Sequence, residues 1–539
     1  MDDLHVDRIA EPAAGGCLSR RRVLRAGAAG GLAAAVATAT GRLAQRAAAQ
    51  TDGATPVAGP TADWAAFDDA VQEAMGTFEM VGAAVAVVTA DGIAHGRTFG
   101  VRDLASGAPV TPETHFMVAS TTKSMSSLLV ATYVDDGALA WDQPAREVWP
   151  DFRAPTEELT ASLRVRDLLG MGSGIGEPAA LSGFHEGDPT ALELLQSVVN
   201  LPVVDDRVDG TFFYNNTVYA VGGYLPGLVE QTTADDLEAV YERQMAERVY
   251  RPAAMGTARI ADDPRPFVEN YATGYGSDFV LGTAAEPYAP VGSYAPVGGT
   301  TATLTDMANY VAMQLRGGTS VEGTRVVSAA NLAECWEPHV AVPTSPTLDP
   351  DATSSGYGMG WISVQYNDGR RLVWHNGGID GFVTHIAFLP EENLGLVILT
   401  NIGPEPRGLF FAPYVVNLLL STQFGLNQGA NPAVVDAYRA ASDGLDRLAA
   451  QAGPVDPAAV APYLGHYEKG WSLGFDADGS LRLRLGSRSF RIMAMPDGGY
   501  VMASGIVAGQ PVDLTRDENG MPRLAIGDIE TVNWTVGPA

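Results

Sequence analysis

"ASTTKS", residues 119–124, places Ser120 three positions before Lys123. The chain has 34 basic residues, and only Lys123 and Lys469 among them are lysine. In a helix that begins near Ser120, positions i and i+3 share one face, so hydroxyl and amine would be neighbours. A buried lysine can lose its proton and accept one from a hydroxyl, whereas arginine stays protonated in proteins. The pair indicates a serine nucleophile; an exposed lysine near a helix start is the plainer alternative.

A second motif lies in "GTFFYNNTVYAVGGYL", residues 210–225, where Tyr214 stands two positions before Asn216. A phenol beside a lysine ammonium can titrate low and act as a general base. An amide such as Asn216 can hold a substrate carbonyl. Tyr-x-Asn by itself is a weak signal and more typical of a surface turn, so this motif depends on the other two.

The third motif is His-Asn-Gly-Gly in "VWHNGGIDGF", residues 373–382, at the end of an apolar run. Glycines in a strand allow a substrate backbone to approach closely. The N–H of Gly378 and the N–H of Ser120, at a helix start, would together form an oxyanion hole. Taken alone, the motif also fits a glycine-rich turn after an edge strand.

In this order the three motifs resemble the serine β-lactamase and penicillin-binding-protein superfamily, in its class C-like branch. The resemblance covers most of residues 62–405. It implies acyl transfer through a covalent intermediate on the serine. The implied roles are these: Ser120, nucleophile; Lys123, aid to its deprotonation; Tyr214, base that protonates the leaving group; Ser120 and Gly378, oxyanion hole; Asn216, His375, Asn376 and Gly377, substrate binding.

The sequence departs from this family at His375, where class C β-lactamases carry lysine. Neutral imidazole attracts a carboxylate less than ammonium does, so anion binding at His375 would fade as pH passes about 6.5. We therefore expect an exported serine hydrolase of esters or D-amino-acid amides and peptides, with weak β-lactamase activity. A non-catalytic protein that binds cell-wall peptides on the same scaffold is the alternative.

The rest of the chain predicts an α+β fold in two parts. A hairpin at 81–100 and three apolar runs at 371–401 predict one antiparallel sheet with helices packed on it and an all-helical lobe. Period-two alternation and regular turns near the C-terminus predict a small β-barrel or sandwich. The predicted divisions are an export signal (1–49), a linker (50–61), the hydrolase domain (62–428), a linker with one helix (429–456) and the barrel-like domain (457–539).

The first 49 residues read as an export signal of the twin-arginine type, with "SRRRVLR" at 19–25 before a weakly apolar, glycine-rich segment. We therefore expect a periplasmic, extracellular or wall-associated protein with no integral membrane segment after cleavage. The net charge of −29 disfavours a nucleic-acid partner. No metal-ligand spacing stands out, so we expect no metal and no cofactor, and the substrate to be a small molecule or peptide. Oligomeric state is left open.

Overall fold

The computed structural model describes residues 63–177, 189–205, 208–230, 236–485, 488–527 and 530–536. The predicted export signal and the linker that follows it lie outside the described residues. In the described part of the chain, no helix is long and apolar enough to cross a membrane.

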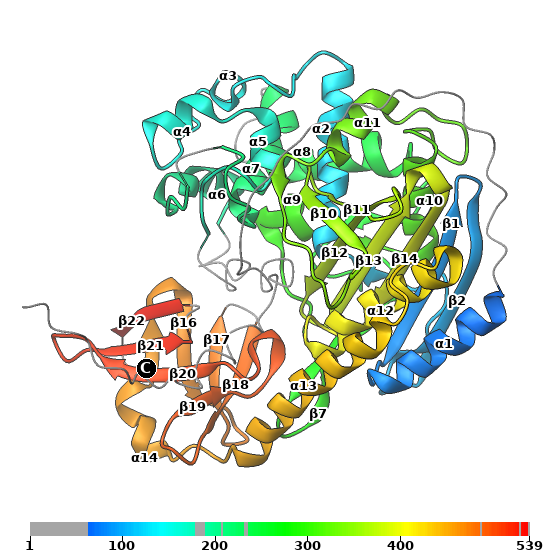
Figure 1. Cartoon of the computed structure of the whole chain (residues 1–539). Helices are drawn as coiled ribbons and strands as arrows, with labels where there is room; N and C mark the ends of the chain where they lie inside the picture. Colours follow the sequence, from blue (N-terminus) through cyan, green and yellow to red (C-terminus); the bar gives the residue numbers. More distant parts are fainter. Residues whose placement is uncertain are drawn as a thin grey trace, which may run out of the picture.

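The predicted sheet is present and has nine antiparallel strands in the order β3-β2-β1-β14-β13-β12-β11-β10-β9 (Figure 1). The two ends of the domain meet in it, because β1 from the N-terminal side pairs with β14, about 300 positions later along the chain. The strands are β1 (Gly82–Thr89), β2 (Gly92–Asp103), β3 (Ala108–Pro109), β9 (Val340–Ala341), β10 (Ala352–Tyr357), β11 (Ile362–Tyr366), β12 (Arg371–Ile379), β13 (Phe382–Leu389) and β14 (Leu394–Thr400).

Helices cover both faces of the sheet. α10 (Leu304–Leu315) packs on one face, where Val311 lies against Gly395, and α12 (Pro406–Phe424) packs on the other, against Val383. α1 (Trp64–Thr77) lies beside α12. Because both faces are covered, every residue of β13 and β14 is buried.

A helical lobe stands at one end of the sheet, in cyan and green in Figure 1. Its helices are α2 (Thr122–Asp135), α3 (Ala145–Val148), α4 (Glu157–Ser162), α5 (Val165–Leu169), α6 (Ala191–Ser197), α7 (Asn216–Val229) and α8 (Leu237–Gln244), with α9 (Ala295–Gly298) and α11 (Ala329–Trp336) between lobe and sheet. α2 is buried at every position from Thr122 to Tyr133, so it is the central helix of this part of the molecule.

Two small sheets complete this domain. One has the order β4-β8-β5, with β4 (Phe116–Met117), β8 (Thr300–Ala302) and β5 (Arg259–Ile260). Its strand β4 leads into the turn that contains Ser120. The other is a hairpin of β6 (Tyr275–Asp278) and β7 (Gly282–Ala285).

The C-terminal part is a closed, eight-stranded barrel with its own core, which includes Trp471, Leu483 and Val532. α13 (Ala430–Gln451) packs against α12 and leads toward the barrel, and α14 (Pro457–Val460) precedes it (Figure 1). The barrel strands are β15 (Gly465–Tyr467), β16 (Trp471–Phe475), β17 (Leu481–Leu485), β18 (Arg488–Ala494), β19 (Tyr500–Met502), β20 (Pro511–Arg516), β21 (Pro522–Ile526) and β22 (Glu530–Val536).

Candidate active site

Ser120 lies in a tight turn between β4 and α2. The turn is a single 3₁₀ segment, Ala119–Thr121, and Ala119 has φ +48°, in the left-handed region that residues with a Cβ rarely adopt. The Thr384 hydroxyl of β13 and the Thr121 hydroxyl both donate to the Val118 carbonyl, each at 2.8 Å. This strained turn, held from the sheet, presents a partly exposed Ser120 at the start of α2.

Lys123 is fully buried one turn along from Ser120. Its Nζ lies 3.1 Å from Ser120 Oγ and 3.1 Å from the Val297 carbonyl oxygen. Burial lowers the pKa of this amine to about 7, against a smaller opposing effect of Glu177. Near neutral pH a large fraction of the amine is therefore uncharged, and an uncharged amine at hydrogen-bond distance from Ser120 Oγ can accept the hydroxyl proton.

Tyr214 is the third member of this group. Its ring centroid lies 4.7 Å from Lys123 Nζ, and its phenol is close enough to Ser120 for the Ser120 hydroxyl to lower the pKa of the phenol. The sequence predicted a low pKa for this phenol, and the structure differs. Burial raises the pKa of Tyr214 above that of a free phenol, and this effect is larger than the opposite effect of Ser120. Tyr214 is thus placed as a proton donor, and Lys123 is the group with a pKa suited to accept a proton.

The third motif lies on the part of β12 that faces Ser120. β11 pairs with β12 only as far as Trp374, so within the described part of the chain residues 375–379 have no strand on that edge. A methyl group added at Gly377 would lie 2.1 Å from the Val118 carbonyl oxygen and 3.0 Å from Ser120 N. The sequence predicted that a substrate backbone would approach these glycines closely. At Gly377 it is the turn that contains Ser120 that makes the close approach.

Gly378, the next residue, is exposed at this open edge. The two-residue turn Asp380-Gly381 makes Ile379 and Phe382 the first partners of the hairpin, and Gly378 stands opposite Val383. In such a hairpin the first pair exchanges hydrogen bonds and the second does not. We therefore expect the Gly378 N–H to point away from β13, toward the side where Ser120 lies.

His375 is buried and neutral. Its Nε2 lies 3.1 Å from the Tyr357 hydroxyl, and its Nδ1 lies 2.5 Å from the Asn376 carbonyl oxygen, so both ring nitrogens have protein partners. Burial, with a smaller contribution from the nearby Lys123, lowers the pKa of His375 to about 3. The lowered pKa of His375 is at odds with a change of charge near pH 6.5, while its part in substrate binding stays a prediction.

Asn216 is the first residue of α7, and its position depends on a residue that the sequence did not single out. The carboxylate of Glu177 accepts the Asn216 N–H at 2.6 Å, the Thr217 N–H at 3.1 Å and the Thr217 hydroxyl at 2.6 Å. Burial raises the pKa of Glu177 against these hydrogen bonds and the neighbouring Lys123.

Glu177 could have been noticed from the sequence, because it is the one acidic residue in "LLGMGSGIGEP", residues 168–178. Its link to residues 214–217 spans about 40 positions, however, and no periodic pattern indicates such a contact. Gly360 in "YGMGW" also makes a contact that no sequence pattern indicates. A Cβ atom added at Gly360 would lie 2.9 Å from the carbonyl oxygen of Lys123, so the site has no room for a side chain there.

No group of three His, Cys, Asp or Glu side chains in the described ranges is arranged to hold a metal ion. What the site does bring together is a serine, a lysine with a lowered pKa, a tyrosine and a glycine-rich strand edge. Asn376 and Gly377 lie on that edge, and Asn216 lies at the start of α7.

Comparisons with known proteins agree with this geometry. The Beta-lactamase family model matches residues 67–421, and the chain belongs to this family. An unguisins hydrolase of Aspergillus campestris is 27% identical over 347 residues, which are 62% of this chain and 60% of the relative. Penicillin-binding protein 4 of Amycolatopsis lactamdurans is 26% identical over 60% of this chain and 81% of its own length.

A D-aminopeptidase of Brucella canis is also 26% identical, over 59% of this chain and 56% of the relative. The chain thus matches about 60% of the length of the two hydrolases that are similar to it. Together these relatives support a hydrolase of the β-lactamase family.

Among solved structures, the octameric penicillin-binding protein homologue from Pyrococcus abyssi superposes with a TM-score of 0.57 at 20% identity, covering 87% of this chain and all of that one. SurE with D-Leu superposes with a TM-score of 0.51 at 20% identity, covering 87% of this chain and 99% of that one. At this identity the likeness shows the fold, which is the β-lactamase fold with an appended barrel.

Proposed function

We propose that this protein is an exported serine hydrolase that forms an acyl-enzyme on Ser120 and acts on D-amino-acid amides and peptides or on esters. The observation that carries the proposal is the buried Lys123 amine, which lies 3.1 Å from the Ser120 hydroxyl oxygen and 4.7 Å from the centroid of the Tyr214 ring. A protein that only binds peptides has no need of a lysine with a pKa near 7 at this place.

In the acylation step, neutral Lys123 takes the proton of the Ser120 hydroxyl while Oγ attacks the substrate carbonyl carbon. The oxyanion accepts hydrogen bonds from the N–H groups of Ser120 and Gly378. When the carbon–nitrogen or carbon–oxygen bond breaks, the leaving group takes the phenolic proton of Tyr214. Tyr214 regains a proton from the Lys123 ammonium, so the amine is neutral again.

Deacylation uses the same groups in the same order. A water molecule attacks the ester carbonyl, its proton passes to neutral Lys123, and the oxyanion is held as before. Ser120 Oγ then leaves and is reprotonated through Tyr214 and Lys123. Each turnover thus returns Ser120, Lys123 and Tyr214 to their starting protonation states.

The substrate class follows from the third motif and from the relatives. His375 is neutral and engaged by Tyr357 and Asn376, so it offers no cation to a substrate carboxylate. This supports esters and D-amino-acid amides over carboxylate-bearing β-lactams, on which we expect weak activity. Relatives named D-aminopeptidase, penicillin-binding protein and unguisins hydrolase lie within this range of acyl-transfer reactions.

Labelling by a fluorophosphonate probe tests the proposal, with mass spectrometry to find the modified residue. The wild type should gain one adduct on Ser120, and Ser120→Ala should gain none and lose hydrolysis of a nitrophenyl ester. Thr121→Ser, one residue along, is the matched control and should label normally. Stoichiometric peptide binding without any covalent adduct would instead favour a non-catalytic binding protein.

Export through the twin-arginine route is part of the proposal and rests on residues 19–49. Replacement of both Arg20 and Arg21 by Lys should retain the precursor inside the cell. Wild-type protein should be recovered outside the cytoplasm with a new N-terminus near residue 50, and recovery of the double variant there in equal amount would count against this route.

A further inference from the structure

The C-terminal barrel contacts the turn that follows the oxyanion strand. β12 and β13 are joined by Asp380-Gly381, and Asp380 stands two residues after Gly378, a distance of about 7 Å along a strand. Arg488, the first residue of barrel strand β18, donates from Nε to Asp380 Oδ2 at 2.6 Å. The two side chains are 10% and 6% exposed, so this ion pair between the domains is buried.

The same turn is held closely on its other sides by the hydrolase domain. Gly381, at φ +76°, packs so tightly on Gly274 that a methyl group there would lie 2.5 Å from the Gly274 Cα, and its N–H is close enough to Glu286 to lower the pKa of that carboxyl. The Phe382 ring stacks on Tyr288 with 5.7 Å between centroids. The turn is thus packed by the hydrolase domain at Gly381 and Phe382, and Asp380 is the residue of the turn that pairs with the barrel.

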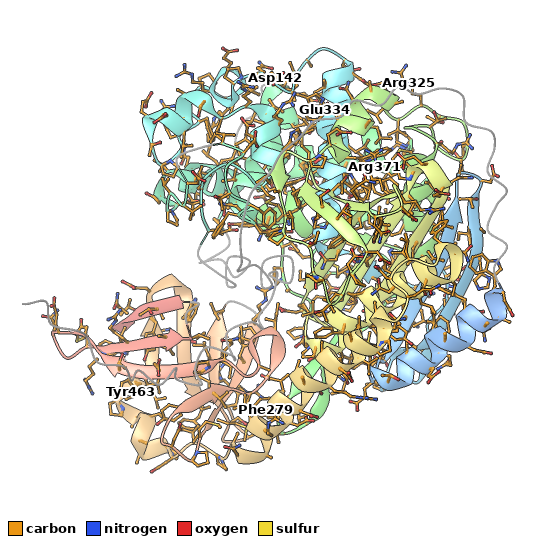
Figure 2. All side chains as sticks on the ribbon, viewed as in Figure 1. Asp142, Phe279, Arg325, Glu334, Arg371 and Tyr463 are labelled. Carbon is orange, nitrogen blue, oxygen red and sulfur yellow. The ribbon has the colours of Figure 1, made fainter. Side chains whose placement is uncertain are left out.

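A second contact between barrel and hydrolase domain lies away from this turn. Arg491, also on β18, pairs with Asp278 at 3.2 Å, and the Phe279 N–H donates to the Ala503 carbonyl at 2.8 Å. Figure 2 shows Phe279 beside the barrel. Both ion pairs are buried and both join the domains, but of these two only the Arg488 pair involves the turn that follows β12, the strand that carries Gly378.

We propose that Arg488 is a positioning residue: through Asp380 it holds the β12–β13 turn, and with it the Gly378 N–H, where the oxyanion of the reaction forms. The inference rests on the proposed function, because it takes Gly378 as an oxyanion donor. It gives the barrel a part in catalysis without any barrel residue touching the substrate. The physical reason is that a hydrogen-bond donor acts on a transition state only when its position is fixed in advance.

Arg488→Met tests this, with Arg491→Met as the matched control, since each variant removes one buried interdomain guanidinium. Arg488→Met should lower kcat for a nitrophenyl ester by about 10- to 100-fold with less than threefold change in KM, because the oxyanion exists only in the transition state. Arg491→Met should stay within threefold of wild type in both constants. Arg488→Lys, which keeps the charge, should recover part of the kcat loss.

Hydrogen exchange supplies a readout that does not depend on activity. Peptides covering residues 375–384 should exchange faster in Arg488→Met than in wild type and should be unchanged in Arg491→Met. If Arg488→Met does not fold, Arg488→Lys and Asp380→Asn serve for the same measurements. Equal exchange in wild type and the Arg488 variants, or equal kcat loss in both Met variants, would overturn the proposal.

The failure of this inference is distinguishable from failure of the proposed function. A wild-type protein that never gains a covalent adduct would refute the acyl-enzyme. The exchange data would then still decide whether Arg488 holds the turn. Normal labelling together with unchanged exchange would refute the positioning role alone.

Discussion

Lys123 and Arg488 are both buried basic side chains, in opposite kinds of surroundings. Around Lys123 lie a hydroxyl, a carbonyl and the rings of Tyr214 and Tyr219, with the carboxylate of Glu177 nearby. Arg488 instead has Asp380 in direct contact at 2.6 Å. The amine can lose its charge in such surroundings, while a guanidinium stays protonated and needs a carboxylate beside it.

The comparison shows two different uses of a buried basic residue in a chain that has only two lysines. A charge that only has to hold two segments together is best carried by arginine, whose planar group binds a carboxylate directionally. A group that must take up and release a proton near neutral pH has to be lysine. Lysine stands at the position where a proton has to move.

The largest expected effect concerns Lys123 itself. Lys123→Arg keeps a cation that cannot give up its proton, and Lys123→Met removes the group. Both should lower the rate of fluorophosphonate labelling by about 10³- to 10⁴-fold, the upper range for loss of a general base. An equal loss of labelling rate in the two variants would sharpen the comparison, because it would show that a permanent positive charge at position 123 does not support the reaction. Labelling of Lys123→Arg within tenfold of wild type would break it.

For the free energy of unfolding the order is reversed: loss of Arg488 should cost more than loss of Lys123. Arg488→Met leaves Asp380 buried without its cation and should lower the free energy of unfolding by about 3–5 kcal/mol. Lys123→Met removes an amine that gains little from burial and should cost less than about 1 kcal/mol. Chemical denaturation, followed by circular dichroism, measures both. A larger loss for Lys123→Met than for Arg488→Met would contradict the account.

Glu177 should tune the proton affinity of Lys123. With the pKa of Lys123 at about 7, kcat/KM should rise about tenfold per pH unit well below pH 7 and level off above it, because only the neutral amine reacts. Glu177 raises the pKa of Lys123, so Glu177→Gln should move the rising part of the kcat/KM–pH profile to lower pH. The value of kcat/KM at high pH should change by less than tenfold. A rising part that moves to higher pH would exclude this electrostatic role.

The smallest expected effect is an absence of pH dependence at the third motif. Burial brings the pKa of His375 to about 3, so the residue stays neutral from pH 5 to 8. KM for a substrate that carries a carboxylate should then be flat over that range, and the ratio of its KM to that of an uncharged analogue should be constant. A KM ratio that rises through pH 6.5 would show that His375 titrates and binds the anion.

Much of this arrangement could be predicted from local patterns. Alternation and turn residues predicted the hairpin at 81–100, the meander of β12 to β14 and the C-terminal barrel, because strands and turns are determined by nearby residues. The contact of Ser120 with Lys123 followed from helical spacing, and that with Tyr214 from the order of motifs. These patterns carry their information within a few residues or within a known motif set.

The electrostatic details could not be predicted in that way. The neutrality of His375 depends on Tyr357 and on burial, and the contact of Glu177 with Asn216 joins segments with no shared pattern. The pair of Asp380 and Arg488 joins residues 108 positions apart in two domains. Such contacts arise from tertiary packing, which sets both the partner and the dielectric surroundings of each charge.

The central claim is that Lys123 exchanges its proton near neutral pH, and the scarcity of lysine makes this measurable. In Lys469→Arg, Lys123 is the one remaining lysine of the sequence. Labelled with ¹³C at Cε, it should give a single lysine signal that titrates near pH 7 and is absent from the additional Lys123→Met variant. A signal that titrates near pH 10, as an exposed lysine does, would contradict the account.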